Sequence, residues 1–355
     1  TYDDGDRLTG ASYAGGDCYG YAYDPVGNRT ALTLTTQALI TTSTAYAYDD
    51  ADRLTSVDGM PVTYDERGNL LSDGTWTYTY DAAGRMVRAQ SVDATHVYTY
   101  NGDGLLVAQE LDGVETRFTW DLALALPQVL ETSNGMRNLH GLGLLAVLQD
   151  GAWYYPQQDG IESVRQWTDA AGAVVGMQGY GPFGEPLVPF GPPPAPWGYT
   201  GEWQDPTGLV YLRARWYNPA LGRFTSADTM AAQLEDPQTL NRFAYVRNNA
   251  LRYIDPTGHQ VAIPYMPPMP APWPGAGAYW PTVPLTRGGS PMSERITTRG
   301  EAIADSLERL LPPPSQAPTF EQVLARCPSK LDHLMVFMAL QSTLTDLMRG
   351  WLLAK

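Results

Sequence analysis

Tyr80-Asp81-Ala82-Ala83-Gly84-Arg85-Met86-Val87 is one copy of a motif that recurs along the first third of the chain. Its tyrosine ends an aromatic series at Trp76, Tyr78 and Tyr80, with threonine between the aromatics. A period of two places such aromatics on one face of a β-strand. The aspartate accepts hydrogen bonds from the turn that follows, and glycine allows a positive φ there. Because the next residues begin a returning strand, each copy is predicted to be a β-hairpin.

The same motif occurs several times, which makes it an internal repeat. A single two-stranded hairpin is marginally stable in water, whereas stacked copies cover one another's edges and faces. We interpret the aromatic stripe as a packed, inward-facing surface, and the alternative is an aromatic surface that binds sugar. Full copies also begin at Tyr2, Tyr23, Tyr48 and Tyr64, and weaker copies begin at Tyr100 and Trp120.

The composition agrees with β structure and excludes several classes of function. The 355 residues include 22 tyrosines against 7 phenylalanines, and tyrosine favours strands. A formal net charge of −15 argues against a nucleic-acid-binding surface spread over the molecule. No run of 18 apolar residues occurs, so no membrane span is predicted. Cys18 and Cys327 form neither a disulfide framework nor a zinc ribbon, and we expect no cofactor and no metal.

Three dense motifs follow the repeats. The first runs from Tyr154 to Pro186, the second from Tyr199 to Asp228, with Leu221-Gly222-Arg223-Phe224 near its end, and the third from Leu240 to Gly258. Together with the repeats they closely resemble the Rhs repeat-associated core of the Rhs/YD-repeat family. That family includes bacterial polymorphic toxins and the cocoon component of ABC (Tc) toxins. The resemblance covers residues 1–258.

The resemblance implies a mainly β fold in which YD-repeat hairpins are wound as a spiral sheet into a partial hollow shell. We predict a YD-repeat shell over residues 1–121 and a repeat-associated core domain over 122–258. Nine prolines between residues 264 and 291 predict a proline-rich linker over 259–291. Apolar residues near a period of 3.6 then predict a helical C-terminal cargo or variable region over 292–355.

The resemblance also implies a function. In the family the shell encloses the polypeptide that follows the core, commonly a toxin, and many members cut this cargo free after a DPxGL segment as aspartic autoproteases. Asp255-Pro256-Thr257-Gly258-His259 stands in that place, which puts the scissile bond between His259 and Gln260. Asp228 and Asp255 match the family's paired aspartates, and Arg223 is a candidate support for a carboxylate or for the oxyanion.

Paired carboxylates suit this chemistry because like charges in one site keep one group protonated. One carboxylate can then activate water as a base while the other protonates the leaving nitrogen. The sequence departs from the family pattern at Thr229-Met230 after Asp228, at His259 in place of the usual leucine, and around Asp159. A second Asp-Pro-Thr-Gly, at Asp205–Gly208, is interpreted as an ordinary turn that leads into a strand.

The alternative to a toxin-type shell is a non-proteolytic cell-surface or adhesion β-shell that binds carbohydrate or protein. The two hypotheses differ in whether Asp228 and Asp255 approach each other and face His259. A third hypothesis makes the helical tail an enzyme. The expected partners are the chain's own C-terminal segment, components of a secretion system or toxin complex, and cell-surface carbohydrate. We expect a secreted or cell-surface location, with any export signal in a region that precedes this chain.

Overall fold

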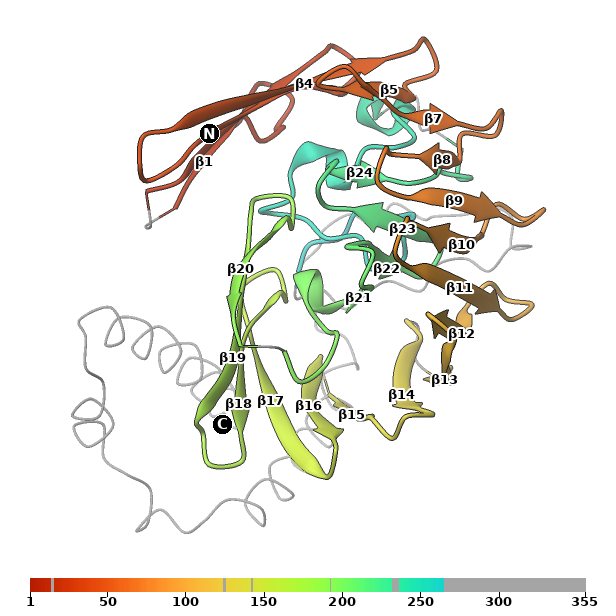
Figure 1. The fold of residues 1–355 in the computed structure, drawn as a ribbon. Helices are drawn as coiled ribbons and strands as arrows, with labels where there is room; N and C mark the ends of the chain where they lie inside the picture. Colours follow the sequence, from red (N-terminus) through yellow and green to blue (C-terminus); the bar gives the residue numbers. More distant parts are fainter. Residues whose placement is uncertain (14–15, 124–125, 142, 192, 232–235, 265–355) are drawn as a thin grey trace, which may run out of the picture. The chain divides into compact units, whose positions relative to one another are not determined.

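The computed structural model describes residues 1–13, 16–123, 126–141, 143–191, 193–231 and 236–264 (Figure 1). The chain divides into two compact units, Thr1–Gly275 and Ala276–Lys355, and every described residue belongs to the first unit. The predicted linker beyond residue 264 and the predicted helical region 292–355 therefore lie outside the described residues.

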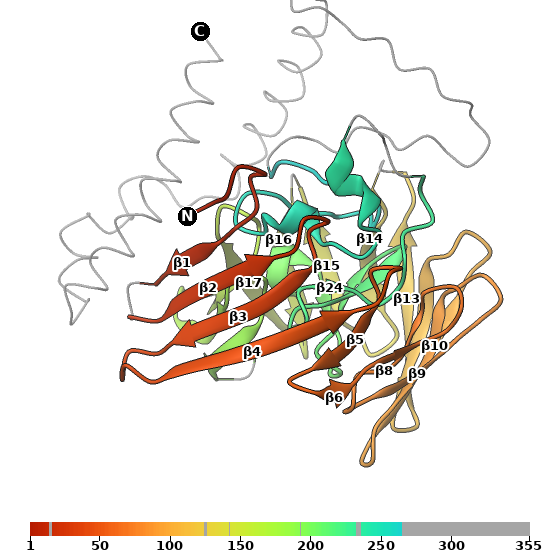
Figure 2. The same cartoon turned by 90° about the horizontal axis from the view of Figure 1, so that it is seen from above.

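The strands of the described residues form three sheets in which neighbours in the sequence pair antiparallel. The first sheet has six strands, which lie side by side in Figure 2. They are β1 (Gly10–Ser12), β2 (Cys18–Tyr23), β3 (Arg29–Thr35), β4 (Thr41–Tyr48), β5 (Leu54–Val57) and β6 (Met60–Pro61).

The second sheet has fourteen strands and crosses the predicted boundary between residues 121 and 122 without interruption, because β13 pairs with β14. Its first strands are β7 (Thr63–Tyr64), β8 (Leu70–Ser72), β9 (Thr77–Tyr80), β10 (Met86–Gln90), β11 (Thr95–Tyr100), β12 (Leu106–Leu111) and β13 (Val114–Asp121). It continues with β14 (Gln128–Thr132), β15 (Arg137–His140), β16 (Leu144–Gln149), β17 (Ala152–Gln158), β18 (Val164–Asp169), β19 (Val174–Tyr180) and β20 (Pro186–Phe190).

The third sheet has four short strands and belongs to the predicted core domain. They are β21 (Trp203–Gln204), β22 (Val210–Leu212), β23 (Arg215–Asn218) and β24 (Arg223–Phe224). Three short 3₁₀ helices accompany it, η1 (Tyr199–Gly201), η2 (Pro237–Leu240) and η3 (Val246–Asn248). The prediction of a mainly β fold is confirmed. None of the helices in the described ranges is long and apolar enough to cross a membrane.

The YD turn has the hydrogen bonds that its residue types predict. Asp81 Oδ1 accepts hydrogen bonds from the backbone nitrogens of Ala83 (2.9 Å) and Arg85 (3.0 Å). Its second oxygen accepts one from Arg85 Nε at 2.7 Å, and Gly84 takes a φ of +79°. The same bonds recur at Asp49, four residues before Arg53. The turns of the hairpins therefore rest on contacts within five residues of sequence.

Arginines of the YD turns also join one repeat to the next. Arg85 Nη1 donates a hydrogen bond to the carbonyl oxygen of Asn101, in the following turn, at 2.9 Å. Arg53 Nη1 donates in the same way to the carbonyl of Asp65 at 3.2 Å. Each of these arginines thus holds its own turn through Nε and the next turn through Nη1, which fixes the stacking of neighbouring hairpins.

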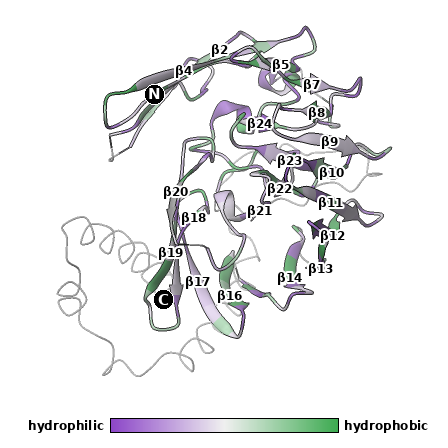
Figure 3. Cartoon of the chain, in the orientation of Figure 1, coloured by the Kyte–Doolittle hydropathy of each residue, from purple (hydrophilic) through white to green (hydrophobic). Residues whose placement is uncertain are grey.

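The aromatic stripe faces the core, as the interpretation of a packed surface predicts. Tyr78 and Tyr98, two residues before their turns begin, are buried. The next aromatic along each strand is partly buried, and Tyr100 donates its hydroxyl to the carbonyl of Met86 at 2.8 Å. The buried rings of Tyr78 and Tyr98 are therefore not open to a sugar. Polar and apolar residues alternate along many strands, whereas β16 is apolar over most of its length (Figure 3).

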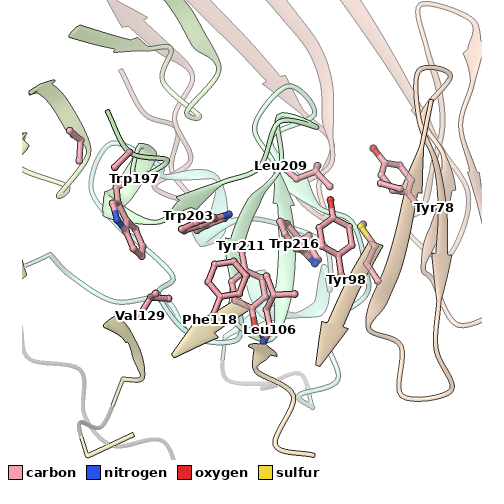
Figure 4. Close-up of a cluster of buried hydrophobic side chains, with 14 of the residues drawn as sticks. Tyr78, Tyr98, Leu106, Phe118, Val129, Trp197, Trp203, Leu209, Tyr211 and Trp216 are labelled. Atoms are coloured by element: carbon pink, nitrogen blue, oxygen red, sulfur yellow. Dashed lines mark hydrogen bonds between the residues drawn. The ribbon is translucent and has the colours of Figure 1, made fainter. Parts of the chain in front are cut away.

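The two faces of the four-stranded sheet pack against different parts of the two larger sheets. Trp216 belongs to the cluster of Figure 4, where it lies against Tyr98, and its indole nitrogen donates to the hydroxyl of Tyr100 at 2.9 Å. The next residue, Tyr217, points to the opposite face and belongs to a second buried cluster with Tyr21. Alternation along β23 therefore places the sheet between the two larger sheets.

Candidate active site

The predicted cleavage segment forms a tight hairpin at the end of the described chain. Ile254 and Ala262 exchange both backbone hydrogen bonds, at 2.9 and 2.7 Å. Inside this hairpin Asp255 Oδ1 accepts hydrogen bonds from the backbone nitrogens of His259 (3.1 Å) and Gln260 (2.9 Å). The nitrogen of Gln260 is the one that cleavage between His259 and Gln260 would release. The predicted acidic residue therefore lies beside the predicted leaving group.

The turn between β22 and β23 holds this hairpin through three successive carbonyl groups. The bonds run from Arg213 Nη1 to Pro256 O (2.6 Å), from Ala214 N to Thr257 O (3.3 Å) and from Arg215 Nε to Gly258 O. Gly258 has a φ of +75°, and a Cβ atom there would collide with the carbonyl oxygen of Leu212. Only glycine permits both this backbone conformation and this close approach.

Backbone hydrogen bonds to a YD turn and to the third core motif hold the second aspartate in position. Asp228 follows β24, and the residue before it, Ala227, donates its backbone nitrogen to the carbonyl of Gly68 at 3.1 Å. The backbone nitrogen of Asp228 donates to the carbonyl of Arg242 at 2.9 Å, and Arg242 Nε returns a bond to the Asp228 carbonyl at 2.8 Å. The backbone of Asp228 is thus held between a YD turn and the third core motif.

Arg215 brings the two carboxylates together. Its Nη2 lies 2.7 Å from Asp228 Oδ2 and 3.8 Å from Asp255 Oδ2. The guanidinium is buried, and its Cζ lies 3.6 Å from the centre of the Phe224 ring. One buried cation thus faces both carboxylates and, through Nε, the carbonyl of Gly258. The predicted pair of aspartates is assembled around an arginine rather than around a direct carboxyl–carboxyl hydrogen bond.

The environment drives the pKa values of the two carboxyl groups apart. Burial raises the pKa of Asp255 above its usual value, although the Arg215 charge and the Gln260 amide oppose the shift. Burial also acts to raise the pKa of Asp228, but the hydrogen bond from His259 and the Arg215 charge outweigh it and lower that pKa. Two carboxyl groups whose pKa values diverge are suited to be an acid and an ionised partner.

His259 is the third side chain at the site. Its Nδ1 lies 2.8 Å from Asp228 Oδ1, which also accepts a hydrogen bond from the backbone nitrogen of Met230 at 2.8 Å. Its backbone nitrogen bonds to Asp255. The residue that carries the predicted scissile carbonyl therefore contacts both aspartates, one through its ring and one through its backbone.

Arg223 lies away from the carboxylates. Its Nη2 donates to the carbonyl of Asp52 in a YD turn at 2.6 Å, and its guanidinium lies against the Tyr48 ring. Arg223 pairs with Asn218 across β23 and β24, and Asn218 is three residues from Arg215. The two arginine side chains therefore leave opposite faces of the sheet. Arg215, which stands in the same sequence motif, occupies the position that was expected of Arg223.

The second Asp-Pro-Thr-Gly segment is a turn, as predicted. The backbone nitrogen of Asp205 donates to the carbonyl of Leu209, and β22 begins at the next residue. Asp205 Oδ1 accepts a hydrogen bond from the Tyr98 hydroxyl at 3.0 Å and lies 3.1 Å from His96 Nδ1. Identical tetrapeptides thus serve two tertiary environments. In the described part of the chain, no group of three or more histidine, cysteine, aspartate or glutamate residues could hold a metal ion.

Comparison with known proteins identifies a family and relatives that share this architecture. A family model described as teneurin YD-shell matches residues 1–251 and so ends just before Asp255. The tRNA3(Ser)-specific nuclease WapA of Bacillus spizizenii is 27% identical over 267 residues, which cover 72% of this chain and 11% of the relative. Toxin subunit YenC2 of Yersinia entomophaga is 26% identical over 210 residues, which cover 49% of this chain and 20% of the relative.

A solved structure shares the fold. The crystal structure of TcdB2-TccC3-Cdc42 superposes with a TM-score of 0.58 at 18% sequence identity, over 73% of this chain and 15% of that chain. This chain therefore spans a fifth or less of each of these three proteins. The repeat motif, the antiparallel sheets that it builds and the match over residues 1–251 agree. The chain belongs to the Rhs/YD-shell family, the family that the teneurin YD-shell model describes.

Proposed function

We propose that this chain is the closing part of a shell that encloses the polypeptide after residue 259 and releases it by cutting its own backbone between His259 and Gln260. The observation that supports the proposal most directly is the 2.9 Å distance between Asp255 Oδ1 and the backbone nitrogen of Gln260. The Gln260 N–H donates to this oxygen in the uncut chain. Once attack on the His259 carbonyl carbon has made the nitrogen tetrahedral, a carboxyl group this close can give it a proton as the C–N bond breaks.

The proposed roles follow from the two environments. Asp255, buried and with a raised pKa, is the general acid. Asp228, whose pKa is lowered beside Arg215 and His259, is the ionised partner on the side where water is activated. Arg215 holds both carboxylates and the Gly258 carbonyl and so orients the hairpin. Arg213 and Ala214 restrain the preceding carbonyls, which keeps the cleaved bond in register with Asp255.

The proposed cargo is the chain's own C-terminal segment. Two relatives support a toxin-type role by their names, one a tRNA nuclease and one a toxin subunit. We accordingly propose export from the cell, with secretion or toxin-complex components as partners.

A second candidate is a shell of the same fold that never cuts itself and acts in adhesion to protein or carbohydrate. One observation favours it: Arg215 pairs with both aspartates, which is also how a purely structural ion cluster is built. The 33% identity over 130 residues to salivary gland surface protein 1 of Aedes aegypti, 4% of that relative, is in keeping with this candidate.

The test is the intact mass of the purified chain beside two matched variants. Asp255→Asn removes the acid at the proposed site, and Asp205→Asn makes the same change in the second Asp-Pro-Thr-Gly segment. Self-cleavage predicts that the wild type and Asp205→Asn split at His259–Gln260 while Asp255→Asn stays whole. A wild type that stays whole although folded, by its tryptophan fluorescence, would overturn the protease function and leave the adhesion shell.

A further inference from the structure

The imidazole of His259 is placed as a base and not only as part of the substrate. Its Nδ1 lies 2.8 Å from Asp228 Oδ1. Asp228 is the carboxyl whose pKa is lowered, so it is ionised and accepts a hydrogen bond from Nδ1–H. That bond selects the tautomer whose Nε2 carries the lone pair. The His259 side chain is 27% exposed, so water can reach the ring.

Both carboxylate oxygens of Asp228 already have partners in the protein. Oδ2 is paired with Arg215 Nη2 at 2.7 Å, and Oδ1 accepts hydrogen bonds from His259 and from the backbone nitrogen of Met230. A carboxylate that is bonded at both oxygens and has a lowered pKa is a poor acceptor for a proton from water. It is well suited to orient an imidazole and to stabilise the imidazolium that forms.

We propose that His259 is the base that activates water for cleavage of its own peptide bond, with Asp228 as its positioning residue. This inference rests on the proposed self-cleavage and assigns a further residue to it. Water loses a proton to Nε2 while its oxygen forms a bond to the carbonyl carbon of His259. The C–N bond to Gln260 then breaks as Asp255 gives its proton to that nitrogen. One water is consumed, and a carboxyl group and an amine form.

The groups around His259 determine how cleavage responds to pH. Asp228 faces the ring from the segment after β24, and Arg215 on β23 and Arg242 hold Asp228. Asp255 faces the backbone of His259 from its own hairpin. As a base the imidazole acts only in its neutral form, and Asp255 acts as an acid only while it carries its proton. A cleavage rate that needs both forms first rises and then falls with pH.

The experiment uses chain that is purified unfolded in urea, and so is still uncut, and measures the rate of self-cleavage against pH once refolding starts the reaction at a defined time. His259→Asn keeps an amide that can bond to Asp228 but cannot take a proton. His259→Leu removes both properties. His140→Asn is the matched control, because His140 lies on β15 in the fourteen-stranded sheet and its ring is bonded to the carbonyl of Val129.

The proposal predicts that His259→Asn and His259→Leu each cleave about 100-fold more slowly than the wild type, and that the residual rate no longer rises with pH. His140→Asn should keep the wild-type rate and profile. If Asp255→Asn stops cleavage while both His259 variants cleave at the wild-type rate, the inference fails and the proposed function stands. If the folded wild type is uncut at every pH, both fail.

Discussion

Arg215 and Asp228 form an ion pair at 2.7 Å in which the two side chains are only 5% and 16% exposed. The same guanidinium nitrogen lies 3.8 Å from Asp255. Because this buried cation is paired with the ionised Asp228, its removal leaves a largely buried carboxylate without its partner. Arg215 is therefore expected to stabilise the folded protein as well as to serve the proposed chemistry.

Replacement of Arg215 by methionine is expected to lower the free energy of unfolding by about 3–5 kcal/mol, the usual cost of leaving a buried charge without its partner. Urea unfolding followed by tryptophan fluorescence measures it. The control is Arg137→Met, which breaks an exposed pair with Glu131 and should cost less than about 1 kcal/mol. Equal losses in the two variants would mean that burial does not govern the Arg215 pairs.

Gly258→Ala is expected to displace the cleavage hairpin. A Cβ there meets the carbonyl oxygen of Leu212 and lies 2.9 Å from the backbone nitrogen of Arg215. Gly104→Ala is matched, because Gly104 also has a positive φ but no neighbour within 4 Å of a Cβ. We expect Gly258→Ala to stop self-cleavage and Gly104→Ala to leave it intact with a stability loss of about 1 kcal/mol. Cleavage by both variants at equal rates would contradict the tight fit of Gly258.

Two adjacent leucines test which face of strand β8 packs in the core. Leu70 is fully buried on β8, whereas Leu71 is 38% exposed on the other face. Leu70→Ala is expected to cost about 2–5 kcal/mol of unfolding free energy through lost burial and a residual cavity. Leu71→Ala should cost roughly 0.5 kcal/mol. A reversed order would show that β8 presents its other face to the core.

Acid is expected to lower the stability of the sheets that the YD repeats form. Burial acts to raise the pKa of the turn aspartates Asp3, Asp49 and Asp81, but their backbone amide and arginine hydrogen bonds outweigh it and lower each pKa. A lowered folded-state pKa contributes stability above the unfolded pKa and loses it as pH falls through the folded one. The melting temperature should therefore fall as pH drops below about 4.

Asp81→Asn checks the source of that acid effect, because asparagine keeps the shape of the turn but does not titrate. Its melting temperature should be lower than that of the wild type at pH 7, and the difference should narrow as the pH falls below the ordinary aspartate pKa, because the wild-type carboxylate, whose pKa is lowered by its hydrogen bonds, then takes up its proton. If the difference in melting temperature stayed constant across this pH range, other carboxyl groups would be responsible for the loss of stability in acid.

The structure of each repeat is determined by residues that lie close together in the sequence. The period of two in the aromatics predicts which side chains turn inward, and Tyr78 and Tyr98 are buried accordingly. The aspartate, glycine and arginine of each turn contact one another within five residues, as at Asp81 and Arg85. Because these contacts need no distant partner, the amino-acid sequence is enough to predict the hairpins, the mainly β class and the family resemblance.

The candidate site is predictable only in part. The motifs single out Asp228, Asp255 and His259, and the structure brings these three residues together. Nearness in sequence points to Arg223, whereas the arginine that faces both carboxylates is Arg215. Arg215 lies 43 residues from the Gly258 carbonyl that it binds, a contact that no local pattern encodes.

The repeat and its turns follow from the amino-acid sequence alone, because they depend on periodicity and on contacts a few residues apart. The two carboxylates are singled out by the resemblance of the motifs to the family. Which arginine joins the carboxylates, and which group the His259 ring faces, depend on the tertiary packing. The pairing of β23 with β24 sends Arg215 and Arg223 to opposite faces, and the 254–262 hairpin packs against the turn at residues 213–215. The first arrangement depends on the register between two neighbouring strands, and the second joins segments 43 residues apart along the chain, which no short stretch of sequence specifies.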